Sequence, residues 1–414
     1  MNWKRACRRW ILPLWLRGFL AGCLSCSFIF SLFLGMRDSV ERSDDLANKY
    51  RDQRNKKINS QQFKIHLPNM AARRNVIIVS HGRSGSSITG DIFNHHPDVF
   101  YLYEPLQTVQ RTQQKFNVGY KGLAEIFLTK VLGCSFDEPL FLEDIEWYYR
   151  RAVHPKISRA IGSPPLCPYN LSDEKWDYKK CSKMTSKSLG KACKNHYQLT
   201  VIKILLSRIP QNSLQSIISA CNSEDIDCKI VFLVRDPRAV IPSSLSVRFY
   251  EEQGGVGKLG TRKFSYDLCK ITEENLYFLG HLPDWLRSRI MLLRYEDLAN
   301  KPLKQMRRLY KFAGLSVIES VADWLNRVTH PSKSRDEIKI TGSQAAFTVD
   351  DAQAAINRWR WKVHPHEIAI IEKYCKGVIK LMGYTLLHNS FELQSNISIP
   401  LYSQDYEAKD WFQD

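Results

Sequence analysis

The stretch from Val76 to Ile88, which reads VIIVSHGRSGSSI, decides the fold of this chain. Its first residues are apolar and β-branched and predict a buried strand, which leads into a short loop of Gly and Ser with one Arg. A helix is expected next, through Asp91, Ile92 and Phe93. A strand, a loop of small residues and a helix in this order can surround a phosphate with backbone N–H groups, so the stretch predicts an anion-binding site.

This loop departs from two common nucleotide-binding motifs. A nucleoside-triphosphatase loop has Lys directly after its last glycine, and here Ser86 follows Gly85. A dinucleotide-binding loop has three spaced glycines, of which Gly82 and Gly85 supply only two. The loop therefore suits an anion, with Arg83 as its fixed positive charge, and a simple Gly- and Ser-rich turn is the alternative.

A second strand and turn of the same kind occur at residues 229–244, which read KIVFLVRDPRAVIPSS. Asp236 and Pro237 are favourable residues for the N-cap and the first turn of a helix. Pro242 leaves open a later start for this helix, because a proline inside a helix removes a hydrogen bond and kinks the chain.

Charged and hydroxyl side chains surround this second turn. Arg235 and Arg238 bracket it, and Ser243 follows about two helical turns later. Two strand ends that each carry Arg and Ser could clamp the two ends of one doubly phosphorylated nucleotide. A later helix start at Pro242 would weaken the assignment of Ser243.

Together the two segments resemble the donor site of the sulfotransferase superfamily, most closely that of the Golgi carbohydrate 6-O-sulfotransferases, which act on galactose, N-acetylgalactosamine or N-acetylglucosamine. Further segments match in order across most of residues 75–385, namely 98–105, 201–203, 293–298 and 359–360. The resemblance implies PAPS (3′-phosphoadenosine 5′-phosphosulfate) as the co-substrate. It assigns the 5′-phosphosulfate to Gly82, Arg83, Ser84, Gly85, Ser86, Ser87 and Ile88. It assigns the 3′-phosphate to Arg235, Asp236, Pro237, Arg238 and Ser243.

The order of apolar runs predicts the fold class. Strand-like runs alternate with helical stretches, at residues 76–79, 201–206, 230–234 and 290–293. This alternation predicts an α/β fold with a mainly parallel sheet flanked by helices, and the resemblance implies the P-loop-like sulfotransferase fold. Residues 151–195 are expected to form an inserted, disulfide-pinned loop region, and Gly254–Gly257 to form a lid or an acceptor loop.

Sulfuryl transfer to a sugar hydroxyl needs stabilisation of negative charge and a base for the hydroxyl proton. Arg83 stands where many sulfotransferases have Lys, and because Arg stays protonated its catalytic role is charge stabilisation and not proton donation. Glu104, which precedes Pro105 at the end of an apolar run, is the predicted base, and the resemblance supports this role. A structural role for Glu104 and a base at His81 are the alternatives.

Three further segments have roles that the sequence leaves open. Lys203 either contacts phosphate or acceptor, or is solvated or salt-bridged. Arg294–Leu298 is expected to tie the core together. Trp359–Trp361 either packs in the core or forms a wall that stacks on a sugar. No spacing typical of a metal site is present, so no metal is predicted.

The charge of the chain indicates an acidic partner. There are 60 Lys and Arg against 42 Asp and Glu, a formal net charge of +18. The folded part has no zinc-finger spacing and no RNA-binding signature, so nucleic acid is not the expected partner. A glycan acceptor, either a glycosaminoglycan or an N- or O-linked glycan, is expected instead, and a generally basic surface is the alternative. Which sugar is modified is left open, as is a homodimer.

Two other functions remain as alternatives. A P-loop kinase-like enzyme would share the strand, loop and helix, but the loop lacks the Lys of that class. A non-catalytic lumenal glycan-binding protein on the same fold would need none of Arg83, Glu104 and Arg235, and all three are present.

The N-terminal residues predict a membrane anchor. Residues 1–17 are basic and form the expected cytoplasmic tail, and residues 18–35 are uncharged and about long enough to span a bilayer. A cleaved signal peptide is the alternative. A stem at 36–73 and a lumenal sulfotransferase domain at 74–414 are expected to follow. This is the plan of a single-pass type II protein, which the resemblance places in the Golgi membrane.

A lumenal domain makes its cysteines disulfide candidates. Three of the 11 cysteines lie in or before the apolar span, and the other eight are Cys134, Cys167, Cys181, Cys193, Cys221, Cys228, Cys269 and Cys375. Their pairing is not determined by the sequence. The tripeptides that begin at Asn170 and Asn396 are N-glycosylation acceptors, which would make the protein a glycoprotein.

Overall fold

The computed structural model describes residues 72–116, 118–152, 157–168, 177–221, 223–247, 260–329, 352–404 and 406. The expected membrane anchor, residues 36–71 of the stem, the Asn170 acceptor and the Gly254–Gly257 loop all lie outside these residues, and Arg73, the last residue of the expected stem, begins the first strand. Within them, none of the helices combines the length and the apolar character that crossing a bilayer requires.

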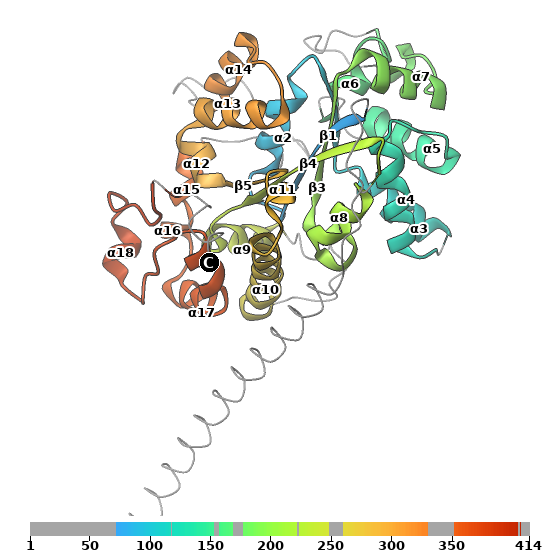
Figure 1. Ribbon diagram of the computed structural model, residues 1–414. Helices are drawn as coiled ribbons and strands as arrows, with labels where there is room; N and C mark the ends of the chain where they lie inside the picture. Colours follow the sequence, from blue (N-terminus) through green and yellow to red (C-terminus); the bar gives the residue numbers. More distant parts are fainter. Residues whose placement is uncertain are drawn as a thin grey trace, which may run out of the picture. The chain divides into compact units, whose positions relative to one another are not determined.

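The centre of the fold is a five-stranded sheet in which every neighbouring pair of strands is parallel (Figure 1). The strand order is β2-β3-β1-β4-β5, so β1 lies in the middle. The strands are β1 (Arg73–Ser80), β2 (Val99–Tyr103), β3 (Leu199–Leu205), β4 (Ile226–Val234) and β5 (Ile290–Arg294). The predicted parallel α/β sheet is therefore confirmed, and each predicted apolar run lies in or next to a strand.

Burial explains why these runs form strands. Val76, Ile77, Ile78 and Val79 are all fully buried, and all five residues of β2 are buried. A parallel sheet covered on both faces requires near-continuous apolar runs, and β-branched residues fit its pleated surface.

Helices cover both faces of the sheet. Figure 1 shows α2 (Ser86–Asn94) and α13 (Pro302–Ala313) on one side, with α8 (Leu214–Ala220), α10 (Thr261–Gly280) and α17 (Pro365–Leu381) on the other. The remaining α-helices are α3 (Leu106–Phe116), α4 (Tyr120–Leu132), α5 (Pro139–Trp147), α6 (Arg159–Gly162), α7 (Ser186–Lys191), α9 (Pro237–Ser246), α11 (Asp284–Arg287), α12 (Tyr295–Asn300), α14 (Glu319–Thr329), α15 (Ala352–Asn357), α16 (Trp359–Lys362) and α18 (Phe391–Ser395). Short turns of other helix types are η1 (Tyr148–Ala152), η3 (Tyr178–Lys180), η4 (Ala192–His196), η5 (Leu206–Arg208) and η6 (Pro210–Asn212).

All eight cysteines outside the N-terminal segment are paired as disulfides. The pairs are Cys134–Cys193, Cys167–Cys181, Cys221–Cys228 and Cys269–Cys375. The second pair lies within residues 151–195 and the first ties that segment to Cys134, which agrees with a disulfide-pinned insertion. The last pair joins α10 to α17, two helices that pack along each other.

The helix that follows β4 begins where Asp236 and Pro237 predict. Asp236 is its N-cap, and the Asp236 side chain accepts a hydrogen bond from the Arg238 backbone N–H at 2.9 Å. Pro242 lies inside the helix, so the later start that this proline left open is wrong. Ser243 therefore belongs to the helix, as the site assignment requires.

Candidate active site

The loop after β1 is shaped by two residues with positive φ. Arg83 has a φ of 64° and Gly85 a φ of 88°. A Cβ atom at Gly85 would lie 2.2 Å from Cδ2 of Tyr295, the first residue of α12. Only glycine fits this position, because the backbone conformation is left-handed and the Tyr295 ring packs directly against the loop.

The loop ends at the start of α2, with Gly85 as the N-cap. Gly85 supplies no side-chain cap, and the first turn of α2 contains no acidic residue. The backbone N–H groups of Ser86, Ser87 and Ile88 belong to this first turn, where N–H groups have no acceptor within the helix. Together with the helix dipole, these donors suit an anion. Gly82 and Ser84, which complete the loop, are buried.

The structure brings Arg83, Arg235 and Ser243 together at the ends of β1 and β4. Arg83 donates from Nε to Ser243 Oγ at 3.1 Å, and Arg235 donates from Nη1 to the Arg83 carbonyl oxygen at 2.9 Å. Burial lowers the pKa of Arg83, and the nearby positive charge of Arg235 lowers it further. Two cations so close together repel each other, so an anion between them would be stabilised.

Carbonyl and aromatic contacts hold Arg235 in place. Its Nη2 donates to the Ala355 carbonyl oxygen at 2.7 Å, and its guanidinium lies over the Tyr295 ring, 4.3 Å from the centroid. No carboxylate of the described residues lies within ion-pair distance of Arg235, and its Nε is buried without a hydrogen-bond partner among them. A buried donor without a partner is unusual, and an anionic ligand could accept its hydrogen bond.

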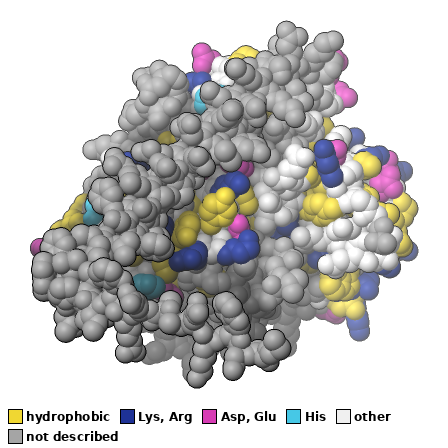
Figure 2. Space-filling view, turned by 90° about the horizontal axis from the view of Figure 1, so that it is seen from below, with side chains coloured by type: hydrophobic (Ala, Val, Ile, Leu, Met, Phe, Trp, Pro, Cys, Tyr) yellow, Lys and Arg dark blue, Asp and Glu magenta, His cyan; other side chains and the backbone are white. Residues whose placement is uncertain are grey.

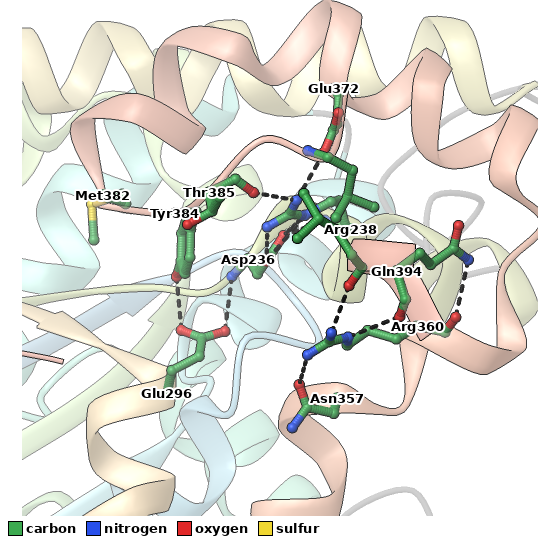
Figure 3. Close-up of polar contacts among 12 residues, drawn as sticks. Asp236, Arg238, Glu296, Asn357, Arg360, Glu372, Met382, Tyr384, Thr385 and Gln394 are labelled. Carbon is green, nitrogen blue, oxygen red and sulfur yellow. Dashed lines mark hydrogen bonds and ion pairs between the residues drawn. The ribbon is translucent and has the colours of Figure 1, made fainter. Parts of the chain in front are cut away.

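Arg238 has different surroundings, which Figure 3 shows. Its guanidinium contacts both Asp236 and Glu372, and it also donates from Nη1 to the Thr385 carbonyl oxygen at 2.7 Å. It is fully buried and lies 4.6 Å from the centroid of the Trp359 ring. The family resemblance assigned Asp236 and Arg238 to the cofactor site. The contacts of Arg238 instead join α9 to α16 and α17. The predicted cofactor role of Asp236 and Arg238, like that of Pro237, stays a prediction that no contact here supports.

The same network continues from Asp236 to α12. The Asp236 backbone N–H donates to Glu296 Oε1 at 3.1 Å, and the Tyr384 hydroxyl donates to Glu296 Oε2 at 2.7 Å (Figure 3). Arg294 donates to Asp297 at 2.7 Å and to the Met382 carbonyl oxygen at 3.0 Å. The expectation that Arg294–Leu298 ties the core together is confirmed.

The Trp359–Trp361 segment divides between core and surface. Trp359 is 5% exposed, and Arg360 is buried and donates to the backbone carbonyl oxygens of α18 and the loop after it. Trp361 is 58% exposed. The core-packing alternative therefore holds for Trp359.

Glu104, the predicted base, is buried between two cations. It follows β2 with a φ of 47°, and its backbone N–H donates to the Lys203 carbonyl oxygen at 2.7 Å. Lys203 contacts Glu104 Oε1, Arg208 contacts Oε2, and Gln107 donates to Oε2 at 2.9 Å. Burial acts to raise the pKa of Glu104, but the two cations and their hydrogen bonds outweigh it and lower the pKa to about 2. Glu104 is therefore ionised at neutral pH.

Of the roles that the sequence left open for Lys203, the structure shows the salt bridge, which Lys203 forms with Glu104. Sequence reasoning missed the other partners of Glu104, Arg208 and Gln107. Arg208 lies in η5, directly beyond β3, and β3 pairs with β2, whose end precedes Glu104. Parallel strands end at the same edge of a sheet, so an Arg just past a buried strand was the signal available for it.

His81, the alternative base, lies at the end of β1. Its Nε2 is 2.9 Å from Thr272 Oγ1, and the Thr272 hydroxyl donates to the Leu268 carbonyl oxygen at 2.8 Å. Because the Thr272 proton is used in this way, His81 Nε2 is the donor and Nδ1 is the atom that can accept a proton. Burial lowers the pKa of His81 to about 4, so the ring is neutral at physiological pH.

Some basic side chains are exposed beside hydrophobic ones. Figure 2 shows Lys and Arg side chains next to hydrophobic ones near the middle of the face seen from below. Basic groups at a surface attract acidic ligands. The described residues thus combine two separate features: two strand ends with Arg and Ser side chains in contact, and a carboxylate held ionised by two cations.

The family model of the sulfotransferase domain matches residues 73–383, a range that contains all five strands. Carbohydrate sulfotransferase 6 of Homo sapiens is 30% identical over 355 residues, which cover 80% of this chain and 85% of that protein. Carbohydrate sulfotransferase 1 of Danio rerio is 28% identical over 368 residues, which cover 80% and 83%. Among solved structures, the sulfotransferase domain from the curacin biosynthetic pathway covers 75% of this chain and 98% of that chain, with 18% identity and a TM-score of 0.41.

Proposed function

This chain belongs to the sulfotransferase family, and from that premise we propose that it transfers a sulfuryl group from PAPS to the 6-hydroxyl of a sugar in a glycan. The observation that carries the proposal is the convergence of Arg83, Arg235 and Ser243 at two neighbouring strand ends. The names of the relatives, carbohydrate sulfotransferases 1 and 6, support a sugar as the acceptor. The acceptor sugar would be galactose, N-acetylgalactosamine or N-acetylglucosamine, in a glycan such as keratan or chondroitin sulfate.

The residues present fit PAPS. The buried Arg235 Nε lacks a hydrogen-bond partner among the described residues, and the Gly85 position has no room for a Cβ beside Tyr295. The unpaired donor suits a phosphate oxygen, and the left-handed backbone at Gly85 shapes the loop that leads into the first turn of α2. Arg235 and Ser243 would hold the 3′-phosphate, and Arg83 with the first-turn N–H groups of α2 would hold the 5′-phosphosulfate.

PAPS, when bound, would supply the sulfuryl group: its bond to the 5′-phosphate oxygen breaks, PAP is the leaving group, and the sulfuryl group replaces the proton of the acceptor hydroxyl. Arg83 and the loop N–H groups stabilise the negative charge that develops on the donor side. Glu104 accepts a hydrogen bond from the acceptor hydroxyl and takes its proton. A carboxylate with a pKa of about 2 is a weak base, but it is ionised at neutral pH. A loose transition state, in which the hydroxyl loses its proton late, does not require a strong base.

We also propose the cellular setting that the sequence indicates. Residues 18–35 would anchor the chain in the Golgi membrane as a single-pass type II protein, with the domain from residue 74 onward in the lumen. The four disulfides agree with an oxidising compartment. A homodimer is a further proposal that sedimentation of the detergent-solubilised protein would test.

The test is transfer by the full chain in non-ionic detergent, with radiolabelled PAPS and a panel of keratan, chondroitin and N-acetylglucosamine-terminated acceptors. Label at C6 of one acceptor is the expected result, and label at another carbon would reject the 6-O position. Arg235→Ala should weaken binding of the desulfated nucleotide (PAP) by about tenfold or more, because it removes a charged hydrogen-bond donor. Unchanged PAP affinity would overturn the 3′-phosphate assignment.

The base is tested by two separate variants. Glu104→Gln should lower kcat by about 10²- to 10⁴-fold while PAP affinity is retained, since general-base catalysis contributes that much. Unchanged turnover of this variant together with loss of turnover in His81→Gln would move the role to His81. PAP binding without any transfer, combined with glycan binding, would favour the non-catalytic alternative, and dependence on ATP and Mg²⁺ would favour the kinase-like one.

A further inference from the structure

A pocket of about 160 Å³ lies next to the donor loop and is partly open to solvent. Its described walls come from the end of β1, the segment after β3, α9 and α10. Gly82 forms part of the wall and precedes Arg83, and Ser207 forms part of it and precedes Arg208, whose guanidinium contacts Glu104. The pocket therefore adjoins the proposed anion site through Gly82.

The chemistry of the walls suits an uncharged molecule rich in hydroxyl groups. The polar lining comprises hydroxyl, amide and carboxylate groups, from Ser207, Ser244, Asn212 and Asp267. Phe264, with Leu268 and Ile271, supplies an apolar wall. No Lys or Arg occurs among the described lining residues, so a phosphate or sulfate group would have no counter-charge here. A sugar ring combines an apolar C–H face with several hydroxyl groups, which matches both kinds of wall.

Ser207 provides an observation that points to a ligand. Its Oγ is buried and has no hydrogen-bond partner among the described residues. A buried hydroxyl in this state is costly, and a ligand hydroxyl in the pocket could relieve the cost. The volume is well above the roughly 10–15 Å³ that a single water requires, so the space is not simply the site of one water.

His81 fixes a second wall of the same pocket. Its Nε2 donates to Thr272 of α10, which leaves Nδ1 as an acceptor, and the ring is neutral at physiological pH. Asp267 of α10, whose carboxylate also lines the pocket, forms an ion pair with Lys263 at 2.8 Å that is largely exposed to solvent. The described lining thus offers hydrogen-bond donors and acceptors with one carboxylate and no positive charge.

We propose that this pocket binds an uncharged sugar unit of the acceptor, with Ser207 hydrogen-bonded to one of its hydroxyls. The inference rests on the proposed function and makes Ser207 a residue that determines acceptor affinity. It places the acceptor between α10 and the donor loop.

The experiment compares the full chain in non-ionic detergent with its Ser207→Ala and Ser207→Leu variants. The acceptor is N-acetyllactosamine at saturating PAPS, and PAP affinity is measured separately by calorimetry. Ser207→Ala should raise the acceptor KM about two- to tenfold with little change in kcat, because one hydrogen bond made equally in the ground and transition states is lost. Ser207→Leu should raise KM further because it fills the pocket. Ser219→Ala, an exposed serine on α8, is the matched control and should change neither value.

A second readout separates this inference from the proposed function. Saturation-transfer NMR detects binding of N-acetyllactosamine without nucleotide, and its signal should be lost in Ser207→Leu. A wild-type acceptor KM in Ser207→Leu would overturn the inference and leave the proposed function standing. Loss of PAP affinity with an unchanged acceptor KM would also overturn it, because the pocket would then serve the nucleotide. If wild type bound the sugar and Ser207→Leu did not, the pocket would be supported even where no sulfate were transferred, and the proposed function alone would fail.

Discussion

Replacing Glu104 with Gln should remove a defined part of the acid sensitivity of folding. Burial alone would raise the pKa of Glu104, but Lys203 and Arg208 outweigh it, and the pKa falls from 4.5 to about 2. Gln keeps the size of the side chain and part of its hydrogen bonding, but it does not titrate. The variant therefore isolates the contribution of one ionised carboxylate.

The sign and size of the effect follow from this lowered pKa. A group whose pKa is lowered by folding stabilises the protein above its unfolded pKa, and this stabilisation is lost as the pH falls through the folded value. A change from 4.5 to about 2 corresponds to roughly 3 kcal/mol at neutral pH, at about 1.4 kcal/mol per pKa unit. About 2 kcal/mol of this should be lost between pH 6 and pH 3.

The assay is urea unfolding of the full chain in detergent, followed by tryptophan fluorescence at pH 6 and pH 3. The difference in unfolding free energy between the two pH values should be about 2 kcal/mol smaller for Glu104→Gln than for wild type. Glu143→Gln changes an exposed carboxylate of α5 and should keep the wild-type difference. If Glu104→Gln also kept it, the two cations would not be holding Glu104 ionised, and the reasoning about the base would be refuted.

Two further substitutions test the surroundings of the donor site. Gly85→Ala should lower both the melting temperature and the PAP affinity, because its Cβ would overlap the Tyr295 ring in a backbone conformation that L-residues rarely adopt; an unchanged PAP affinity would show that the loop has room to move. Arg238→Met should lower the unfolding free energy by about 3–5 kcal/mol, because it leaves Asp236 and Glu372 buried without their partner. PAP affinity of the folded Arg238→Met protein should stay at the wild-type value, and a loss of more than tenfold would restore Arg238 to the cofactor site.

The fold was largely predictable because its signals are local. The run Val76–Val79 is β-branched and uninterrupted, as a central parallel strand requires, and Gly85 marks a turn that only glycine fits. Asp236 and Pro237 likewise begin a helix through contacts within a few residues. Pro242 was a misleading local signal: it left open a later start for the helix, but α9 continues through it.

The parts of the site that were not predictable depend on contacts between distant segments. Arg208 contacts Glu104 although 104 residues separate them in the sequence, because β2 and β3 are neighbours in the sheet. Arg238 has the same sequence signal as Arg235. The C-terminal segment nevertheless supplies Glu372 and Thr385 as partners for Arg238 and not for Arg235. Sequence spacing placed both arginines at the strand end, but it carried no information about what the last helices bring there.

This difference between neighbouring arginines separates the part of the site that holds the fold from the part left for a ligand. Arg238 is neutralised by two carboxylates and joins α9 to the C-terminal helices. Arg235 has carbonyl and aromatic contacts that orient it but no described carboxylate within ion-pair distance to neutralise it. A cation that is oriented before the ligand arrives, and not neutralised, loses little entropy on binding an anion and keeps its full charge for it. The contacts that fix Arg235 at the end of β4, with the Arg83 and Ala355 carbonyl oxygens and the Tyr295 ring, are thus separate from the network around Arg238.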